Sequence, residues 1–111
     1  MNRERRLTRR REFDVVLREG QAWSTPFFVV RARPNGREVT RFGFIVSRRL
    51  GKAVARNRVK RRLREVCRQL PLRPGWDIVI IAREPAKTAD FWELKRAVEE
   101  TFRRAGLLAE G

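Results

Sequence analysis

The sequence contains no histidine and no tyrosine, and Cys67 is its only cysteine. Without histidine the commonest general base is missing, and both Ser-His catalysis and histidine-based metal sites are excluded. A single cysteine cannot form an intramolecular disulfide or a thiolate zinc cluster. The longest apolar run, residues 78–82, is far shorter than the roughly 20 residues of a membrane-spanning helix. Residues 1–11 are charged with no apolar stretch behind them, so we expect no secretory signal, no membrane contact and a cytoplasmic location.

Positive charge is what the chain has in excess. Its 111 residues include 28 lysines and arginines against 13 acidic residues, a net charge of +15. Residues 42–68 carry ten basic side chains and one acidic side chain, whereas residues 69–111 carry seven of each. The hydrophobic content of 41% is enough for a small core, and the length suits one domain, residues 1–111. We therefore expect a single basic domain whose partner is a polyanion.

The hydrophobic pattern predicts seven elements in one α+β sandwich of order α-β-β-β-α-β-α. They are a helix at residues 9–19, a strand at 23–33, one or two further strands at 37–41 and 42–47, a helix at 53–70, a strand at 77–83 and a helix at 91–105. Thr8 is the expected N-cap of the first helix, and Asp90 with Glu93 has the spacing of a capping box for the last. The ends, residues 1–6 and 107–111, are expected to fray.

The central helix is expected to have two contrasting sides. Its apolar stripe recurs at helical spacing and consists of Ala55, Val59, Leu63, Val66, Cys67 and Leu70. The opposite side carries Asn57, Lys60, Arg61, Arg64 and Arg68, with Arg58 and Arg62 on one flank, and Arg56 lies near the edge of the apolar stripe. Only Glu65 supplies an opposite charge, so the bases repel one another. That repulsion indicates that an anion is bound there.

The start of this helix strengthens the prediction of an anion. No Ser, Thr, Asp or Asn stands just before Ala53, so the first backbone N–H groups have no evident cap. Arg48, Arg49 and Lys52 lie at the same end, next to the positive pole of the helix dipole. Such an arrangement is typical of a phosphate site. The alternative is that Gly51 caps weakly and water satisfies the remaining N–H groups.

Residues 47–65 resemble the signature segment of the bacterial ribonuclease P protein subunit. Its centre is the triplet Arg56-Asn57-Arg58, followed by Lys60-Arg61. Residues 7–13 resemble the opening helix of that family, residues 42–47 the strand before the basic helix, and residues 77–86 the strand after it. The resemblance implies a fold like domain 2 of ribosomal protein S5, with a left-handed crossover through the basic helix. The pattern alone would favour a right-handed one.

The resemblance also implies a function. Proteins of this family bind a large catalytic RNA, and the complex, an endoribonuclease, removes the 5′ leader from precursor tRNA. The RNA supplies the active site and binds Mg²⁺, so no catalytic residue, metal ligand or cofactor is expected in this chain, and no protein partner is required. Asp14, Asp77 and Asp90 lie far apart in the sequence, which gives no support to a two-metal site. The RNA contacts implied for the basic helix and the loop before it are Arg48, Arg49, Lys52, Arg56, Asn57, Arg58, Lys60, Arg61, Arg62, Arg64 and Arg68.

By the same resemblance, the 5′ leader lies in a cleft between the first helix and one face of the sheet. The implied cleft residues are Phe13, Val16, Leu17, Phe27, Val29 and Arg31, and Arg9, Arg10 and Arg11 are additional RNA contacts. Aromatic rings and guanidinium planes stack on single-stranded bases without reading sequence, which suits a variable leader. The family commonly has aromatic residues at the positions of Leu17 and Arg31. The alternative role of Arg31 is therefore a contact with a phosphate instead of stacking on a base. For the apolar residues of the cleft, the alternative is that they belong to the hydrophobic core.

Other nucleic-acid-binding classes match less of the chain. Residues 41–46 partly match the aromatic strand of RNA-recognition motifs but lack its extra glycine and terminal aromatic. A DNA-binding regulator has little support, because the basic helix has no helix-turn-helix partner. A small structural ribosomal protein has the same size and charge, so composition leaves that alternative open.

Overall fold

The computed structural model describes residues 3–109, which follow the predicted order of helices and strands. The elements are η1 (Arg3–Arg5), α1 (Arg10–Glu19), β1 (Gln21–Ser24), β2 (Phe28–Pro34), β3 (Arg41–Ile45), η2 (Arg48–Leu50), α2 (Ala53–Gln69), β4 (Trp76–Ala82), η3 (Glu84–Lys87) and α3 (Phe91–Ala105). Among the helices of these described residues, none is long and apolar enough to cross a membrane.

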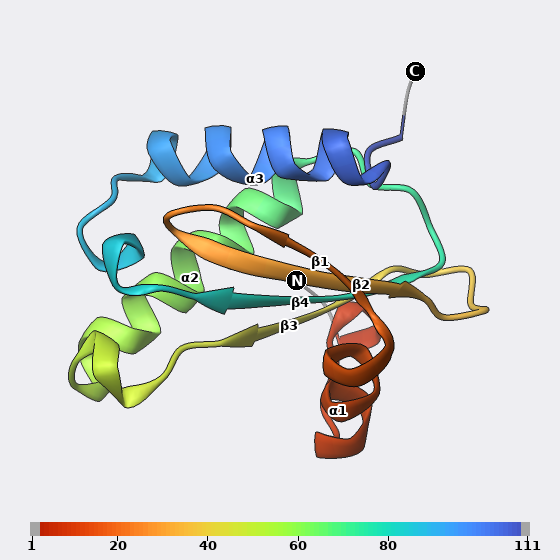
Figure 1. Ribbon diagram of the computed structural model, residues 1–111, viewed down its shortest axis with the longest axis horizontal. Coiled ribbons are helices and arrows are strands. Elements are labelled where there is room, and N and C mark those ends of the chain that lie inside the picture. The colour runs from red at the N-terminus through yellow and green to blue at the C-terminus, as the bar shows by residue number, and fades with distance from the viewer. Residues whose placement is uncertain (1–2, 110–111) are drawn as a thin grey trace.

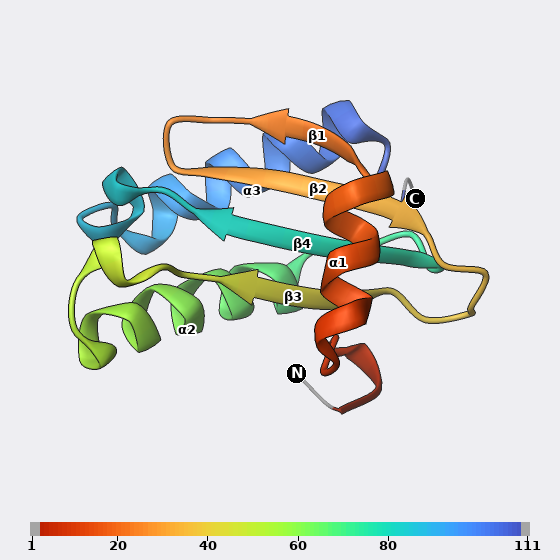
Figure 2. The ribbon, with the colours of Figure 1, turned by 60° about the horizontal axis from the view of Figure 1, so that its bottom comes forward.

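Within the described chain, four strands form one mixed sheet in the order β1-β2-β4-β3 (Figure 1). β2 is antiparallel to both of its neighbours, whereas β3 and β4 are parallel. The connection between these two parallel strands is α2. In Figure 2 both strands point left, α2 lies behind the sheet and β4 lies above β3. The crossover is therefore left-handed, as the resemblance implied.

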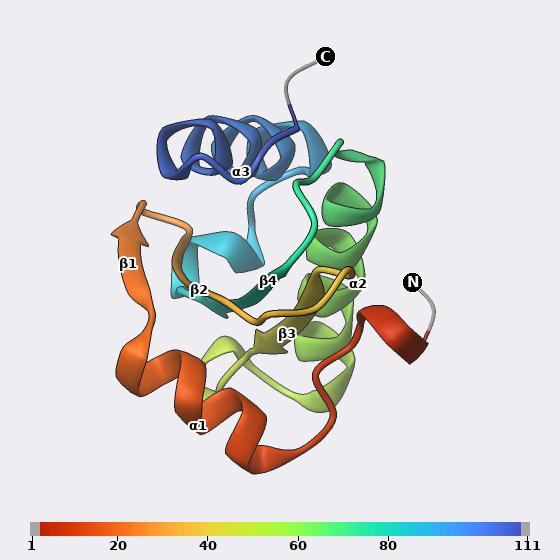
Figure 3. The same cartoon turned by 90° about the vertical axis from the view of Figure 1, so that its right-hand side faces the viewer.

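Helices cover the sheet on both faces. α2 and α3 pack on one face, and α1 crosses the other (Figure 3). The main core lies beneath α2 and α3 and includes the fully buried Leu63 and Ile80. A smaller cluster beneath α1 contains Leu7, Val16 and Val79. β4 is thus buried on both faces, which explains its continuous apolar run.

The strand predicted at residues 23–33 is a hairpin of two strands, β1 and β2. The turn between them is held by Thr25, whose hydroxyl oxygen accepts hydrogen bonds from the N–H groups of Phe27 and Phe28, both at 3.1 Å. Such local side-chain bonds compete with the strand ladder and end it. β2 therefore begins at Phe28, and Phe27 lies in the turn before it.

The possible separate strand at residues 37–41 does not form, because residues 37–40 are in a loop. Hydrogen bonds from the side chain of Asn35 hold this loop in place. Its side-chain oxygen accepts from the N–H of Arg37 at 2.8 Å, and its side-chain nitrogen donates to the carbonyl of Val39 at 3.0 Å. These bonds take the place of a strand ladder, and β3 begins only at Arg41.

Both described chain ends, for which fraying is predicted, contact the body of the protein. Arg6 forms a parallel bridge with Phe42, and Leu108 forms an antiparallel bridge with Leu72. Leu107 is buried in the main core. The rest of that prediction, for residues 1–2 and 110–111, lies outside the described residues.

α3 begins and ends as predicted. The carboxylate of Asp90 accepts from the N–H of Glu93 at 2.8 Å, and the Glu93 carboxylate accepts from the N–H of Asp90 at 3.1 Å. Gly106 ends the helix with a φ of 74°, in the left-handed region that glycine adopts at little cost. The reciprocal bonds confirm the capping box.

α1 begins through Glu12, not through the predicted cap at Thr8. The Glu12 carboxylate accepts from the backbone N–H groups of Thr8 and Arg9, at 3.0 and 2.9 Å, and Arg9 is the N-cap residue. The second carboxylate oxygen accepts from Arg41 of β3 at 2.8 Å. The Arg9 N–H contributes most to lowering the pKa of Glu12 to about 2, the N–H of Thr8 and the Arg41 guanidinium adding to it and burial opposing it.

Arg41 joins α1 to the middle of the sheet. Its guanidinium donates to both carboxylate oxygens of Asp77 in β4, at 2.9 and 2.7 Å, besides its bond to Glu12. Asp77 also accepts from Asn35 at 2.8 Å. The hydrogen bond to Asp77, followed by attraction to its charge and the bond to Glu12, raises the pKa of Arg41 against the effect of burial. We call Asn35, Asp77, Arg41 and Glu12 the ion-pair network.

The network predicts how stability depends on pH. Because folding lowers the pKa of Glu12 from 4.5 to about 2, its contribution to the free energy of unfolding is complete above pH 4.5 and is lost as the pH falls toward 2. Glu12→Gln keeps an oxygen for the helix cap but removes the charge. The difference in unfolding free energy between wild type and Glu12→Gln should therefore shrink over this window in urea titrations. A difference that does not change with pH would contradict the assignment.

Candidate nucleic-acid interface

α2 separates its apolar and basic sides as predicted. Val59, Leu63, Val66 and Cys67 of the stripe are buried. The predicted RNA contacts that are exposed are Arg48, Arg49, Lys52, Asn57, Arg58, Arg61 and Arg68, and the half-buried ones are Arg56, Lys60, Arg62 and Arg64. The amphipathic helix is confirmed, and its contacts with RNA stay a prediction.

Two of these bases already have protein partners. Arg62 donates to the carbonyl of Ala89, just before α3, at 2.9 Å. Arg68 forms an ion pair with Glu65 at 2.6 Å, and that pair lowers the pKa of the Glu65 carboxyl and raises the pKa of Arg68. Within residues 3–109, no other predicted contact on or just before α2 forms an ion pair. Most of the positive charge on this face is therefore available to an anion.

α2 begins without a side-chain cap, again as predicted. Lys52 is its N-cap residue, and no side chain bonds to its first N–H groups. The preceding Gly51 has a φ of 117°, which favours glycine. Lys87 of η3 lies close by, with its ammonium nitrogen 3.7 Å from the position of a Cβ at residue 51. Sequence reasoning missed Lys87, because nothing in the pattern places η3 beside this helix end.

A small groove lies between α1, β3 and α2. Its volume is about 140 Å³, and its lining is Arg6, Leu7, Phe13, Phe42, Gly43, Phe44, Lys60 and Arg64. The Phe13 ring rests on Gly43, so closely that a Cβ on Gly43 would lie 2.6 Å from ring carbon Cζ and closer still to Cε1. The structure thus brings one predicted cleft residue, Phe13, next to two predicted RNA contacts, Lys60 and Arg64.

The other apolar cleft residues do not line this groove. Val16 has no exposed surface and belongs to the small core beneath α1, against which Leu17 also packs. Phe27 packs against the main core, on the other side of the sheet. The prediction that Phe27 shares a face with Val29 and Arg31 is therefore wrong, because the turn at Thr25 takes it out of the strand alternation.

Val29 and Arg31 lie in β2, paired with Ile81 and Val79 of β4, and both are half-buried. The Arg31 guanidinium donates to the carbonyl of Gly20, at the end of α1, at 2.9 Å. Its Nε is buried and has no partner, and the Nε of Arg56 is in the same state. A buried donor without an acceptor costs about 1–3 kcal/mol. Both such atoms belong to residues of the predicted RNA interface.

The other predicted RNA contacts, Arg9, Arg10 and Arg11, are exposed at the start of α1. The three therefore extend the positive surface beyond α2.

Few side chains of the described residues are suited to catalysis by the protein itself. Burial raises the pKa of the Cys67 thiol, which disfavours a thiolate nucleophile. The carboxylates of Asp77 and Asp90, two of the three aspartates whose spacing gave no support to a two-metal site, are bonded within the ion-pair network and the α3 cap. In the described part of the chain, no three potential metal ligands of the His, Cys, Asp or Glu type come together.

The sequence and the fold both match those of known proteins. The family model described as Ribonuclease P matches residues 1–106. The ribonuclease P protein component of Dehalococcoides mccartyi (strain CBDB1) is 43% identical over 110 residues, which cover 99% of this chain and 92% of that protein. The chain belongs to the ribonuclease P protein component family.

Solved structures agree with this assignment. The RNase P protein of Staphylococcus aureus superposes with a TM-score of 0.85 at 29% identity, covering 95% of this chain and 98% of that one. The RNase P protein of Thermotoga maritima gives a TM-score of 0.80 at 35% identity, covering 96% and 98%. The predicted α+β fold class is therefore confirmed, and the family is that of a component of an endoribonuclease in tRNA processing.

Proposed function

We propose that this chain binds the catalytic RNA of ribonuclease P and the 5′ leader of precursor tRNA, and so promotes Mg²⁺-dependent removal of the leader. The observation that carries the proposal is the meeting of Phe13 with Lys60 and Arg64 in one groove beside the basic side of α2. An aromatic ring next to unpaired cations suits single-stranded RNA, whose bases stack while its phosphates are neutralised.

The two parts of this surface have different proposed tasks. The long basic side of α2 consists almost entirely of arginine and lysine, which suits the phosphate backbone of a large folded RNA. The groove is small, about 140 Å³, and suits one or two nucleotides of a leader. Arg31 and Arg56 each bury an Nε without a partner, and a nearby phosphate lowers the cost of holding those charges.

Magnesium ions are proposed to bind the RNA. Of the three aspartates considered for a two-metal site, two are already bonded within the fold, because Asp77 holds Arg41 and Asp90 caps α3. The contribution of the protein is then electrostatic: by neutralising phosphates, it lowers the Mg²⁺ concentration that the RNA needs.

Reconstitution at low Mg²⁺ tests the proposal. Precursor tRNA is incubated with this protein alone, with a bacterial ribonuclease P RNA alone, and with both. We expect cleavage at the mature 5′ end only in the complete mixture. Cleavage by the pure protein would overturn the proposed division of tasks. Tight RNA binding without any gain in cleavage would favour the structural ribosomal-type alternative.

A pair of matched double variants locates the effect. Lys60→Ala/Arg64→Ala removes two charges from the groove, and Arg96→Ala/Arg103→Ala removes two exposed charges from α3, on the far side from α1 (Figure 1). Only the first pair should weaken binding of precursor tRNA and flatten its salt dependence, by about 0.7 in slope for each lost phosphate contact. An equal loss of affinity for precursor tRNA in both double variants would mean that the net charge of the protein, and not the position of the charges, determines binding.

A further inference from the structure

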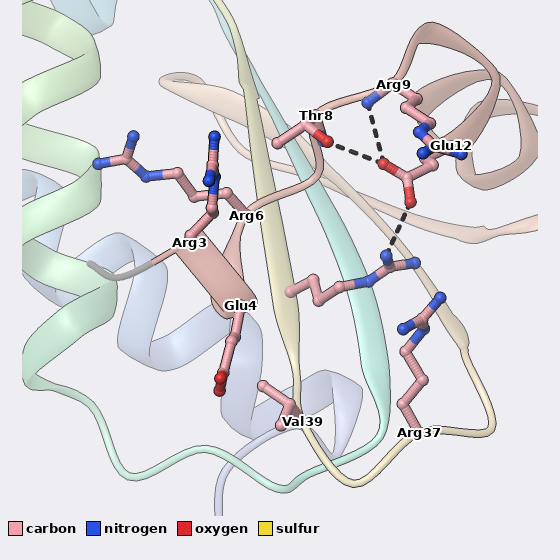
Figure 4. Close-up of a pocket in the computed structure, with 9 residues that line it drawn as sticks. Arg3, Glu4, Arg6, Thr8, Arg9, Glu12, Arg37 and Val39 are labelled. Atoms are coloured by element: carbon pink, nitrogen blue, oxygen red, sulfur yellow. Dashed lines mark hydrogen bonds and ion pairs between the residues drawn. The ribbon is translucent and has the colours of Figure 1, made fainter.

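A second cavity, larger than the groove, lies at the start of α1. Its volume is about 540 Å³, which falls in the usual range of sites for small ligands. η1 and the start of α1 form one side, and the loop between β2 and β3 forms the other (Figure 4). The lining is Arg3, Glu4, Arg6, Thr8, Arg9, Glu12, Arg37, Val39 and Arg41. It includes no residue of α2, and it shares only Arg6 with the groove beside that helix.

The charges around this cavity are unbalanced. Five arginines face two glutamates, and the Glu12 carboxylate is already occupied by Arg41 and the N–H groups of Thr8 and Arg9 (Figure 4). Within residues 3–109, the four remaining arginines of the lining form no ion pair. They are Arg3, Arg6, Arg9 and Arg37. An excess of unpaired guanidinium groups around one concavity attracts anions and suits phosphate oxygens.

The two sides of the cavity are held together by the ion-pair network. Asn35 shapes the loop that carries Arg37 and bonds to Asp77. Asp77 holds Arg41, which in turn holds Glu12 at the start of α1. A continuous chain of hydrogen bonds thus sets the position of the loop relative to the helix. The backbone that carries the arginines of the cavity is therefore held in place before a ligand binds.

We propose that this cavity binds a phosphodiester segment of RNA, as a second contact besides α2. The proposal rests on the proposed function, since it assumes that the chain acts on RNA. Arg9 was an expected RNA contact from the sequence, whereas Arg3, Arg6 and Arg37 were not. Arg37 is the most informative of them, because it reaches the cavity from a loop that no sequence pattern connects with α1.

Substitution of Arg37 tests the proposal. Among the residues that the structure describes, no hydrogen bond or ion pair uses the exposed Arg37 side chain, so Arg37→Ala should leave the free energy of unfolding nearly unchanged. We expect it to weaken RNA binding about fivefold to tenfold and to reduce the salt slope by about 1. Arg37→Lys should retain most of the wild-type RNA affinity and salt slope. Arg96→Ala on α3 is the control with the same change in charge.

Separate binding arms identify the RNA involved. One arm uses a bacterial ribonuclease P RNA alone, and the other compares precursor tRNA with mature tRNA on the preassembled complex. If Arg37→Ala weakens binding to the ribonuclease P RNA alone, the cavity contacts the RNA subunit. If it weakens only the binding of precursor tRNA to the complex, the cavity contacts the substrate. If Arg37→Ala changes RNA affinity no more than Arg96→Ala does in both arms, the cavity does not bind RNA and the proposal is overturned. If wild-type protein binds neither RNA, the proposed function fails together with it.

Discussion

Replacing Arg41 by methionine should lower the free energy of unfolding by about 3 kcal/mol, more than a hundredfold in the folding equilibrium. The Arg41 and Asp77 side chains are only 12% and 8% exposed, and the ion pair between them measures 2.7 Å. Methionine has a comparable length but no charge, so Asp77 would stay buried with Asn35 as its remaining side-chain partner. Glu12 would lose its link to β3 at the same time. Urea unfolding at neutral pH measures the change.

The coupling between these residues provides the control. The double variant Glu12→Gln/Arg41→Met should lose less stability than the sum of the two single variants, because each single change already breaks the same 2.8 Å ion pair. Arg96→Met, at an exposed position of α3, should change stability by less than about 0.5 kcal/mol. Additive losses, or a small effect of Arg41→Met, would show that the network contributes little.

The contrast between α2 and the ion-pair network shows what the sequence could predict. α2 was identified because its apolar stripe and its basic side recur at helical spacing within one short segment, and the Asp90–Glu93 capping box is equally local. The network joins residues from a helix, a loop and two strands, and no periodicity connects them. Its effect on the position of α1 therefore became visible only in three dimensions.

The leader cleft shows the same limit at single residues. Alternation along β2 buries Phe28 and Val30 and leaves Val29 and Arg31 half-buried on the other face. It does not extend to Phe27, because the turn held by the Thr25 hydroxyl places Phe27 before the start of β2. Val16 was expected at the cleft on helical spacing, yet the same spacing equally describes a core residue, and the structure buries it completely. Periodicity tells which side of an element is apolar, but not whether that side faces a core or a ligand.

Gly43→Ala should weaken recognition of the 5′ leader about tenfold, since stacking on an aromatic ring is worth roughly 1–3 kcal/mol per base. An added Cβ would overlap the Phe13 ring, at 2.6 Å from Cζ. The atoms that must move are at the far end of a side chain, so the ring can swing away at a cost to stability of about 1–2 kcal/mol. The fold would survive while the ring leaves its place beside Lys60 and Arg64. The measurement is the ratio of affinities for precursor and mature tRNA on the reconstituted complex.

A double-mutant cycle separates displacement of the ring from general damage. Phe13→Ala should reduce the precursor-to-mature ratio by itself, and Gly43→Ala added to it should have no further effect, because no ring remains to be displaced. Binding to the RNA subunit alone should stay within about twofold of wild type in all three variants, since the basic side of α2 is unchanged. If the two substitutions act additively on the ratio, Gly43 affects the leader by a route other than Phe13. If Gly43→Ala leaves the ratio unchanged, the groove between α1, β3 and α2 does not hold the leader.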